Sequence, residues 1–163
     1  MTIQHKTAPG RPMPGSAHGS EVSNTVDAAV DVLIAENNET NKFYVESVLS
    51  ELGLSFHTVD NGLAVVEAYK RARPRIILMD IAMPLSDGVE ATQNIRRYEQ
   101  RNDLSPIPII ALSANAIPGL SERYLAAGMN DCLLKPCSID QINGKLMEWI
   151  LPPATCAEQR SAQ

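Results

Sequence analysis

Polar residues that could carry out phosphoryl chemistry stand directly after apolar runs of the sequence. Asp80 follows Ile-Ile-Leu-Met, so its carboxylate emerges from a segment with the composition of a buried strand. Such a carboxylate can attack phosphorus and form an acyl phosphate. The other candidates also follow apolar runs: they are Glu36 with Asn37, Ser113, and Lys135.

Each of these side chains suits one part of that reaction. A divalent cation that bridges carboxylate and phosphoryl oxygens needs further oxygen ligands, and Glu36 and Asn37 are placed to provide them. The Lys135 ammonium can neutralise phosphoryl oxygens as a point charge, and the Ser113 hydroxyl can donate a hydrogen bond to them. A polar residue at one strand end means little by itself. Several at one edge of the same sheet indicate a site.

Short apolar runs alternate with helical periodicity between the two ends of the chain. We predict strands over residues 31–35, 56–59, 75–80, 106–113 and 132–134. We predict helices from the cap Asn38 to Gly53, through 65–69, and over 88–100, 120–127 and 139–150. This alternation indicates a parallel sheet covered on both faces. Its ligand site is expected beyond the carboxyl ends of the strands.

Composition limits the class of protein. The 163 residues suffice for one domain, which we place at residues 29–151, between an N-terminal tail (1–28) and a C-terminal tail (152–163). The net charge of −5 argues against nucleic acid as a partner. No apolar run is long enough for a membrane span, no secretory signal is evident, and the three cysteines form no CxxC pair. We therefore expect a cytoplasmic protein with reduced thiols.

Three stretches of the sequence resemble the signatures of response-regulator receiver domains. They are ILMDIAMPLSDG (77–88), IIALSAN (109–115) and LKP (134–136), and the opening ENNETN (36–41) is most like the receivers of hybrid histidine kinases. The resemblance covers about residues 30 to 151. It implies a flavodoxin-like (βα)5 doubly wound parallel sheet with strand order 2-1-3-4-5.

The resemblance also implies a role for each residue. Asp80 is the implied phosphoacceptor, and a histidine kinase or a histidine phosphotransfer protein is the implied donor. Lys135, with a cis peptide bond to Pro136, pairs with the acceptor, and Ser113 turns toward the phosphoryl group. The implied Mg²⁺ ligands are Glu36, Asn37, Asp80 and the backbone carbonyl of Ala82.

Further implications concern partners. The phosphodonor is expected to contact the exposed face of the first helix, which includes Asn41 and Tyr44. A downstream protein is expected to dock near the last strand and helix, because nothing after residue 151 is long enough to form an output domain. We therefore expect a stand-alone receiver that is not an enzyme beyond its own phosphorylation and slow dephosphorylation, and that signals by a conformational shift.

Two residues depart from the family's pattern. Asn37 stands where a second acid is usual, and the loss of one charge near 4 Å corresponds to about 4 kcal/mol at an effective dielectric of 20, before compensation. We therefore expect weak Mg²⁺ binding. Cys132 stands where an aromatic ring is common, three residues before Lys135, and we interpret it as core filler.

Two other functions are alternatives to a phosphorylatable receiver. A pseudo-receiver that docks constitutively and never turns over phosphate is favoured by Asn37 and Cys132, but Asp80, Ser113 and Lys135 argue against it. An enzyme on the same fold fits poorly. A phosphatase with an aspartate nucleophile needs an acid two residues later, where Ala82 stands, and a nucleotide or flavin protein needs a Gly-rich loop after the first strand.

Overall fold

Strands and helices alternate through the part of the chain that the structure describes. The structure is a computed structural model that describes residues 29–150; the tails predicted over 1–28 and 152–163 lie outside the described residues. The strands are β1 (Val32–Ala35), β2 (Phe56–Val59), β3 (Ile76–Asp80), β4 (Ile109–Ser113) and β5 (Asp131–Leu134). The helices are α1 (Glu39–Glu51), α2 (Gly62–Ala72), α3 (Gly88–Arg101), α4 (Leu120–Ala126) and α5 (Ile139–Ile150). None of these helices has the length and apolar character needed to cross a membrane.

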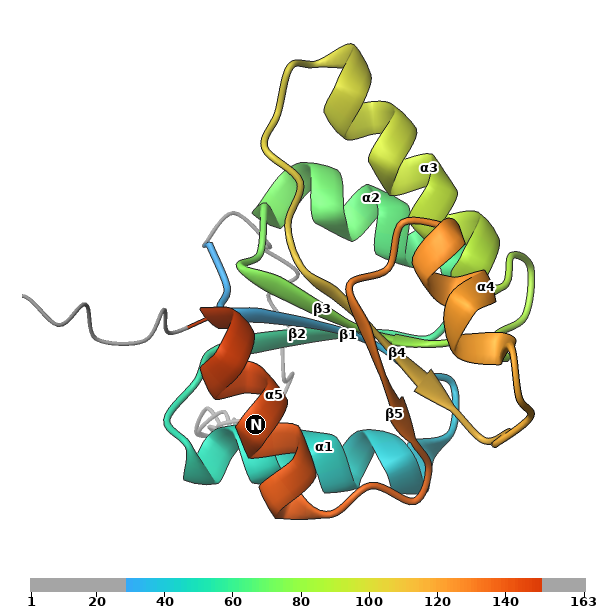
Figure 1. The fold of residues 1–163 in the computed structure, drawn as a ribbon. Coiled ribbons are helices and arrows are strands. Elements are labelled where there is room, and N and C mark those ends of the chain that lie inside the picture. The colour runs from blue at the N-terminus through green and yellow to red at the C-terminus, as the bar shows by residue number, and fades with distance from the viewer. Residues whose placement is uncertain (1–28, 151–163) are drawn as a thin grey trace, which may run out of the picture.

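The five strands form one parallel sheet in the order β2-β1-β3-β4-β5. This confirms the expected flavodoxin-like, doubly wound fold. Helices α1 and α5 cover one face of the sheet, and α2, α3 and α4 cover the other (Figure 1). The strand order reverses between β1 and β3. In such sheets the crevice at this reversal, beyond the carboxyl ends of the strands, is where ligands bind.

The three central strands, β1, β3 and β4, are buried along their whole length. Successive side chains of a strand point to opposite faces. Leu33 and Ile77 therefore pack toward α2 and α3, whereas Ile34 and Leu78 pack toward α1 and α5. Because helices cover both faces, the near-continuous apolar runs read from the sequence are what a buried parallel sheet requires.

Polar side chains cap α1, α2, α3 and α5; at the start of α5, Ser138 Oγ accepts a hydrogen bond from the N–H of Gln141 at 3.2 Å. Asn38 accepts a hydrogen bond from the N–H of Asn41 at 3.1 Å, which confirms the cap predicted for α1. Asn61 and Asp87 cap α2 and α3 in the same way. After α1, Gly53 takes a φ of +69°, which glycine adopts without strain.

The fourth strand begins later than the sequence suggested. We predicted residues 106–113, but β4 begins at Ile109. Pro106 and Pro108 have no N–H to donate to a neighbouring strand. The carbonyl of Pro108 still accepts a hydrogen bond from β3 at 3.0 Å. The prolines therefore shorten the strand at its start and leave Ser113 at its end. The other predicted strand boundaries differ from the observed ones by about one residue.

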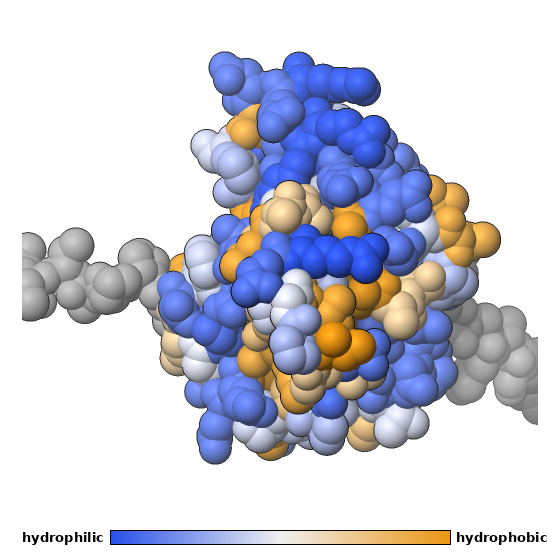
Figure 2. Space-filling model, turned by 45° about the vertical axis from the view of Figure 1, so that its right-hand side comes forward, coloured by the Kyte–Doolittle hydropathy of each residue, from blue (hydrophilic) through white to orange (hydrophobic). Residues whose placement is uncertain are grey.

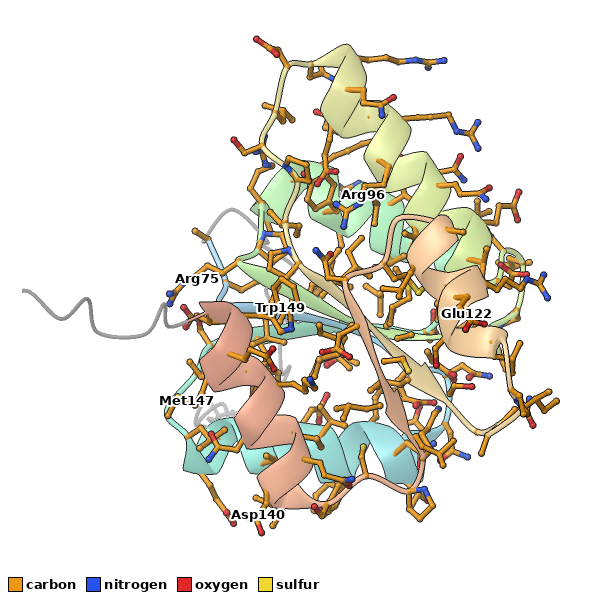
Figure 3. All side chains as sticks on the ribbon, in the orientation of Figure 1. Arg75, Arg96, Glu122, Asp140, Met147 and Trp149 are labelled. Carbon is orange, nitrogen blue, oxygen red and sulfur yellow. The ribbon has the colours of Figure 1, made fainter. Side chains whose placement is uncertain are left out.

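A buried carboxylate, Glu99, connects the elements on the α2–α3 face. It accepts hydrogen bonds from the Tyr69 hydroxyl at 3.0 Å and from the N–H of Ile107 at 3.1 Å. Arg96, which Figure 3 labels on α3, forms a salt bridge with it at 2.7 Å and also donates to the carbonyl of Gly128, before β5. A buried charge is tolerated only when it is paired and hydrogen-bonded. The network therefore fixes α3 against the segments that precede β4 and β5.

Candidate functional site

The predicted site residues meet at the carboxyl edge of the sheet. Asp80 and Ser113 are the last residues of β3 and β4, and Glu36 and Lys135 immediately follow β1 and β5. Glu36, Asp80 and Lys135 are in direct contact. The backbone carbonyl of Ser113 accepts a hydrogen bond from the N–H of Lys135 at 2.8 Å. Among the described residues, the Ser113 side chain makes no hydrogen bond to the other three.

Lys135 bridges the two carboxylates. Its Nζ lies 2.7 Å from Glu36 Oε2 and 3.1 Å from Asp80 Oδ1. The side chains are 1% exposed for Glu36, 6% for Asp80 and 16% for Lys135. Taking charges out of water is costly, and a cation placed between two acids offsets part of that cost. With both acids ionised, the group keeps a net negative charge.

Its surroundings make Asp80 an unusual carboxyl group. Burial raises its pKa, the hydrogen bond from Lys135 lowers it, and the charge of Glu36 raises it again; the net result is a pKa above the usual value. Oδ1 also accepts a hydrogen bond from the N–H of Ala82, on the loop after β3, at 3.2 Å. Oδ2 accepts no hydrogen bond from the residues that the structure describes. Oδ2 is therefore the oxygen of this carboxylate that the described residues leave unengaged.

Lys135 is held in its charged form. Burial alone lowers the pKa of Lys135, but its hydrogen bonds to Glu36 and Asp80 outweigh burial and raise the pKa above the usual value. The peptide bond between Lys135 and Pro136 is cis, as the resemblance implied. The lysine therefore presents a positive charge to the crevice at neutral pH.

Among residues 29–150, the oxygens at this edge of the sheet that could ligate a metal ion include the carboxylates of Glu36 and Asp80. Asn37 is exposed, and its amide brings no charge. Glu36 accepts hydrogen bonds from the N–H of Asn38 at 2.9 Å and from Lys135. Within residues 29–150, no three His, Cys, Asp or Glu side chains are grouped so as to hold a metal. Carboxylate and carbonyl oxygens are nevertheless the ligand type that Mg²⁺ prefers, so the donor set fits that ion in kind.

The Ser113 hydroxyl is engaged by α4. Its Oγ lies 3.1 Å from the hydroxyl oxygen of Tyr124, and the N–H of Asn115 donates to it at 3.2 Å. Sequence reasoning missed Tyr124. The spacing of Leu120 and Tyr124 was a signal for one face of a helix, but spacing carries no information about which hydroxyl the ring would reach.

The two described cysteines pack as small apolar residues. Cys132 lies partly buried against the cluster on the α2–α3 face, which agrees with its interpretation as core filler; its Sγ is 3.5 Å from Ser121 Oγ. Burial raises the pKa of the Cys137 thiol and so disfavours the thiolate. Beside Cys132 lies a groove of about 350 Å³, whose lining includes Ser113, Tyr124 and Leu134.

The fold and this edge of the sheet define a doubly wound α/β protein with a buried aspartate paired to a half-buried lysine. A sequence model of the response regulator receiver domain matches residues 32–147. The chain belongs to this family, which confirms the resemblance. It is thus a receiver domain of two-component and phosphorelay signalling systems.

Two relatives of this chain, both histidine kinases, are much longer proteins. The peroxide stress-activated histidine kinase mak1 of Schizosaccharomyces pombe is 37% identical over 123 residues, which cover 74% of this chain and 8% of that kinase. The sensor histidine kinase GacS of Pseudomonas protegens is 33% identical over 131 residues, which cover 80% of this chain and 14% of GacS. The chain therefore spans a small fraction of the length of these relatives.

Solved receiver structures share the fold. One is the receiver domain of the sensor histidine kinase PA1611 from Pseudomonas aeruginosa, with a magnesium ion in its active-site cleft. It has a TM-score of 0.67 and 38% identity, and the match covers 75% of this chain and 98% of that one. Another comes from the co-crystal of the Saccharomyces cerevisiae phosphotransfer protein Ypd1 with the receiver domain of Ssk1. It has a TM-score of 0.71 and 30% identity, and the match covers 75% of this chain and 89% of that one.

Proposed function

We propose that Asp80 accepts a phosphoryl group from a phosphohistidine. The observation that carries this proposal is the environment of Asp80: a buried carboxylate with Oδ1 tied to Lys135 and Ala82 and with Oδ2 unengaged by the described residues. In the transfer, Oδ2 forms a bond to phosphorus while the phosphorus–nitrogen bond of the donor breaks. The electron pair of that bond stays on the imidazole nitrogen, and Asp80 becomes an acyl phosphate.

Lys135 and Ser113 would stabilise the phosphoryl group once it is attached. The Lys135 ammonium already lies 3.1 Å from Oδ1, so it can neutralise charge on the phosphoryl oxygens with little rearrangement. The Ser113 hydroxyl stands at the end of the neighbouring strand and has to turn away from α4 to donate to those oxygens. The phosphorylated chain then differs from the free chain in the contacts of Ser113, and this difference would start the conformational shift.

We propose Mg²⁺ as the cofactor, held by Glu36, Asn37, Asp80 and the backbone carbonyl of Ala82. When bound, the ion would offset the negative charge of the carboxylates and the phosphoryl oxygens. The hard oxygen donors support this assignment, and so does the magnesium ion in the cleft of the PA1611 receiver. We propose that binding is weak, because Asn37 contributes no charge and Lys135 occupies one oxygen of Glu36.

A histidine kinase or a histidine phosphotransfer protein is the proposed donor, and its proposed docking site is α1. A groove of about 360 Å³ lies between α1 and the segment after β5, and its lining includes Tyr44, Val45 and Lys135. On the same helix Phe43 is 74% exposed and Tyr44 is 38% exposed, so α1 presents apolar surface that a partner could cover. The co-crystal of Ypd1 with the Ssk1 receiver supports a partner of this kind.

The output of the domain is proposed to be a docking event. A downstream protein would bind near β5 and α5, where Leu134 and Met147 are exposed apolar residues. Figure 2, which turns the side of α4 forward, shows hydrophobic residues gathered among hydrophilic ones there; Leu134 lines the groove beside α4. We propose no nucleic-acid partner, and no enzymatic activity beyond slow loss of the chain's own phosphoryl group.

The test of the proposal is a phosphorylation assay on the full chain. The wild-type protein is incubated with acetyl phosphate, with and without Mg²⁺, and its intact mass is measured. We expect one phosphoryl adduct that requires Mg²⁺ and is released by hydroxylamine, as an acyl phosphate is.

Two variants locate the adduct. Asp80→Asn should abolish it. The control Asp87→Asn should keep it, because Asp87 caps α3 and asparagine serves as well in that position. Wild-type protein that gains no adduct, even with a phosphohistidine donor, would instead support the pseudo-receiver alternative, a docking module without phosphoryl turnover.

A further inference from the structure

Tyr124 is the buried side chain of α4, and its hydroxyl meets Ser113. The two hydroxyl oxygens are 3.1 Å apart, and both residues are only 4% exposed. Helix α4 is short, and Gly119 at its start offers no side-chain cap. No other residue of this helix is buried. The position of α4 therefore depends strongly on the surroundings of Tyr124.

The hydrogen-bonding capacity of Ser113 is fully used in this arrangement. A serine hydroxyl donates one hydrogen bond and accepts two. The N–H of Asn115 donates to Ser113 Oγ at 3.2 Å, and the carbonyl of Asn115 accepts its hydrogen at 3.3 Å. The Tyr124 hydroxyl fills the remaining acceptor position. To donate to a group on Asp80, Ser113 has to give up its hydrogen bond to the Asn115 carbonyl, and the turn of its side chain carries Oγ away from the Tyr124 hydroxyl.

Strand β5, next to β4, leaves space into which the Tyr124 ring can move. On β5, Cys132 pairs in register with Ala111 and presents a small thiol toward Ser121 of α4. The groove of about 350 Å³ at this place is lined in part by Ser113, Tyr124 and Cys132. A ring released from Ser113 thus has adjacent space to move into, and its helix has few other buried contacts that resist the movement.

We infer that Tyr124 couples the state of Ser113 to the position of α4. Its hydrogen bond holds Ser113 in the unphosphorylated arrangement and is lost when Ser113 turns to a phosphoryl group on Asp80. This inference rests on the proposed function. Tyr124 acts through Ser113 and is therefore a positioning residue. Removal of its hydroxyl should favour the phosphorylated arrangement by about 2- to 10-fold, the effect of one ordinary hydrogen bond.

The test compares two tyrosines that each lose a buried hydroxyl. Beryllium fluoride with Mg²⁺ serves as the phosphoryl mimic, and its affinity for the full chain is measured by calorimetry. Tyr124→Phe should bind it about 2- to 10-fold more tightly than wild type. Tyr69→Phe is the control: it removes a hydroxyl bonded to Glu99, so it should lower stability without changing this affinity. In a Ser113→Ala background, Tyr124→Phe should have no further effect on the affinity.

Hydrogen exchange of the α4 amides provides a second measurement. In wild type, exchange in α4 should speed up when beryllium fluoride binds, and in Tyr124→Phe it should already be fast without it. Wild-type protein that does not bind beryllium fluoride overturns the proposed function and this inference with it. Wild-type protein that binds, with unchanged affinity in Tyr124→Phe or unchanged α4 exchange on binding, overturns the coupling alone.

Discussion

The ammonium nitrogen of Lys135 lies 3.1 Å from Oδ1 of Asp80, although the two residues are contributed by strands that are not neighbours. β4 separates β3 from β5, so the lysine side chain reaches across the end of β4 to the acid. The same ammonium lies 2.7 Å from Glu36, at the far side of β3. One cation thus joins the carboxyl ends of three strands and compensates two buried acids.

Removal of this cation should destabilise the fold. In Lys135→Met, the buried carboxylates of Glu36 and Asp80 lose the cation that compensates them, and breaking a buried ion pair typically costs about 3 to 5 kcal/mol. We expect a loss near the lower end, measured as the free energy of unfolding in urea at neutral pH. Lys145→Met is the control, because Lys145 pairs with Asp131 and Glu148 nearer the surface and should cost less than about 1 kcal/mol. Equal losses in the two variants would contradict the bridging role.

Asp80→Asn should stabilise the fold, and more so as the pH rises. The pKa of Asp80 is raised, so the native state keeps this proton to higher pH than the unfolded state does. The free energy of unfolding of wild type therefore falls as the pH rises from about 4 toward the raised pKa. The free energy of unfolding of Asp80→Asn does not fall in this way, because the variant has no carboxyl group at this position. At neutral pH its gain should exceed the roughly 0.5 kcal/mol typical of surface substitutions, measured by urea unfolding.

Asp31→Asn provides the opposite sign as a control. Hydrogen bonds from Ser55 hold the pKa of Asp31 below its usual value. The stability that the Asp31 carboxylate contributes is present above the unfolded pKa and is lost as the pH falls through the folded one. As the pH rises, the free energy of unfolding of wild type should therefore increase relative to that of Asp31→Asn. Over the same rise it should decrease relative to that of Asp80→Asn. Parallel pH curves for the two variants would refute both assignments.

The sequence predicted the positions of the site better than its contacts. Apolar runs place Asp80 and Ser113 at strand ends because a buried parallel strand has to be apolar until it leaves the core. Parallel strands then bring those ends to one edge. The bridging of Glu36 by Lys135 was not predicted, since it depends on the reach and rotamer of a long side chain. The hydroxyl contact of Tyr124 was missed for the same reason: periodicity gives the face of a helix but not the partner of a polar atom.

Gly88→Ala should disturb both the fold and the site. A Cβ at Gly88 would lie 2.3 Å from the backbone carbonyl oxygen of Asp80, and backbone atoms there cannot move away without shifting the acceptor. Overpacking of this kind costs about 1 to 3 kcal/mol. Gly144→Ala is the matched control, because Gly144 lies inside α5 and a Cβ there meets nothing within 4 Å. This substitution should raise the free energy of unfolding by about 0.5 to 1 kcal/mol. Urea unfolding of both variants checks the signs, and a Gly88→Ala protein as stable as wild type would disprove the close approach.

Asn37→Asp should tighten Mg²⁺ binding. The substitution restores a carboxylate at an exposed position beside Glu36, and one additional charge near 4 Å corresponds to about 4 kcal/mol at an effective dielectric of 20 before solvent compensates. After compensation we expect roughly a tenfold lower Kd, about 1.4 kcal/mol, measured by calorimetric titration with MgCl₂. Asn38→Asp adds the same charge one residue later and keeps the cap of α1, so it controls for net charge alone. If Asn38→Asp tightened binding as much as Asn37→Asp, the effect would be nonspecific attraction, and Asn37 would not be a ligand position.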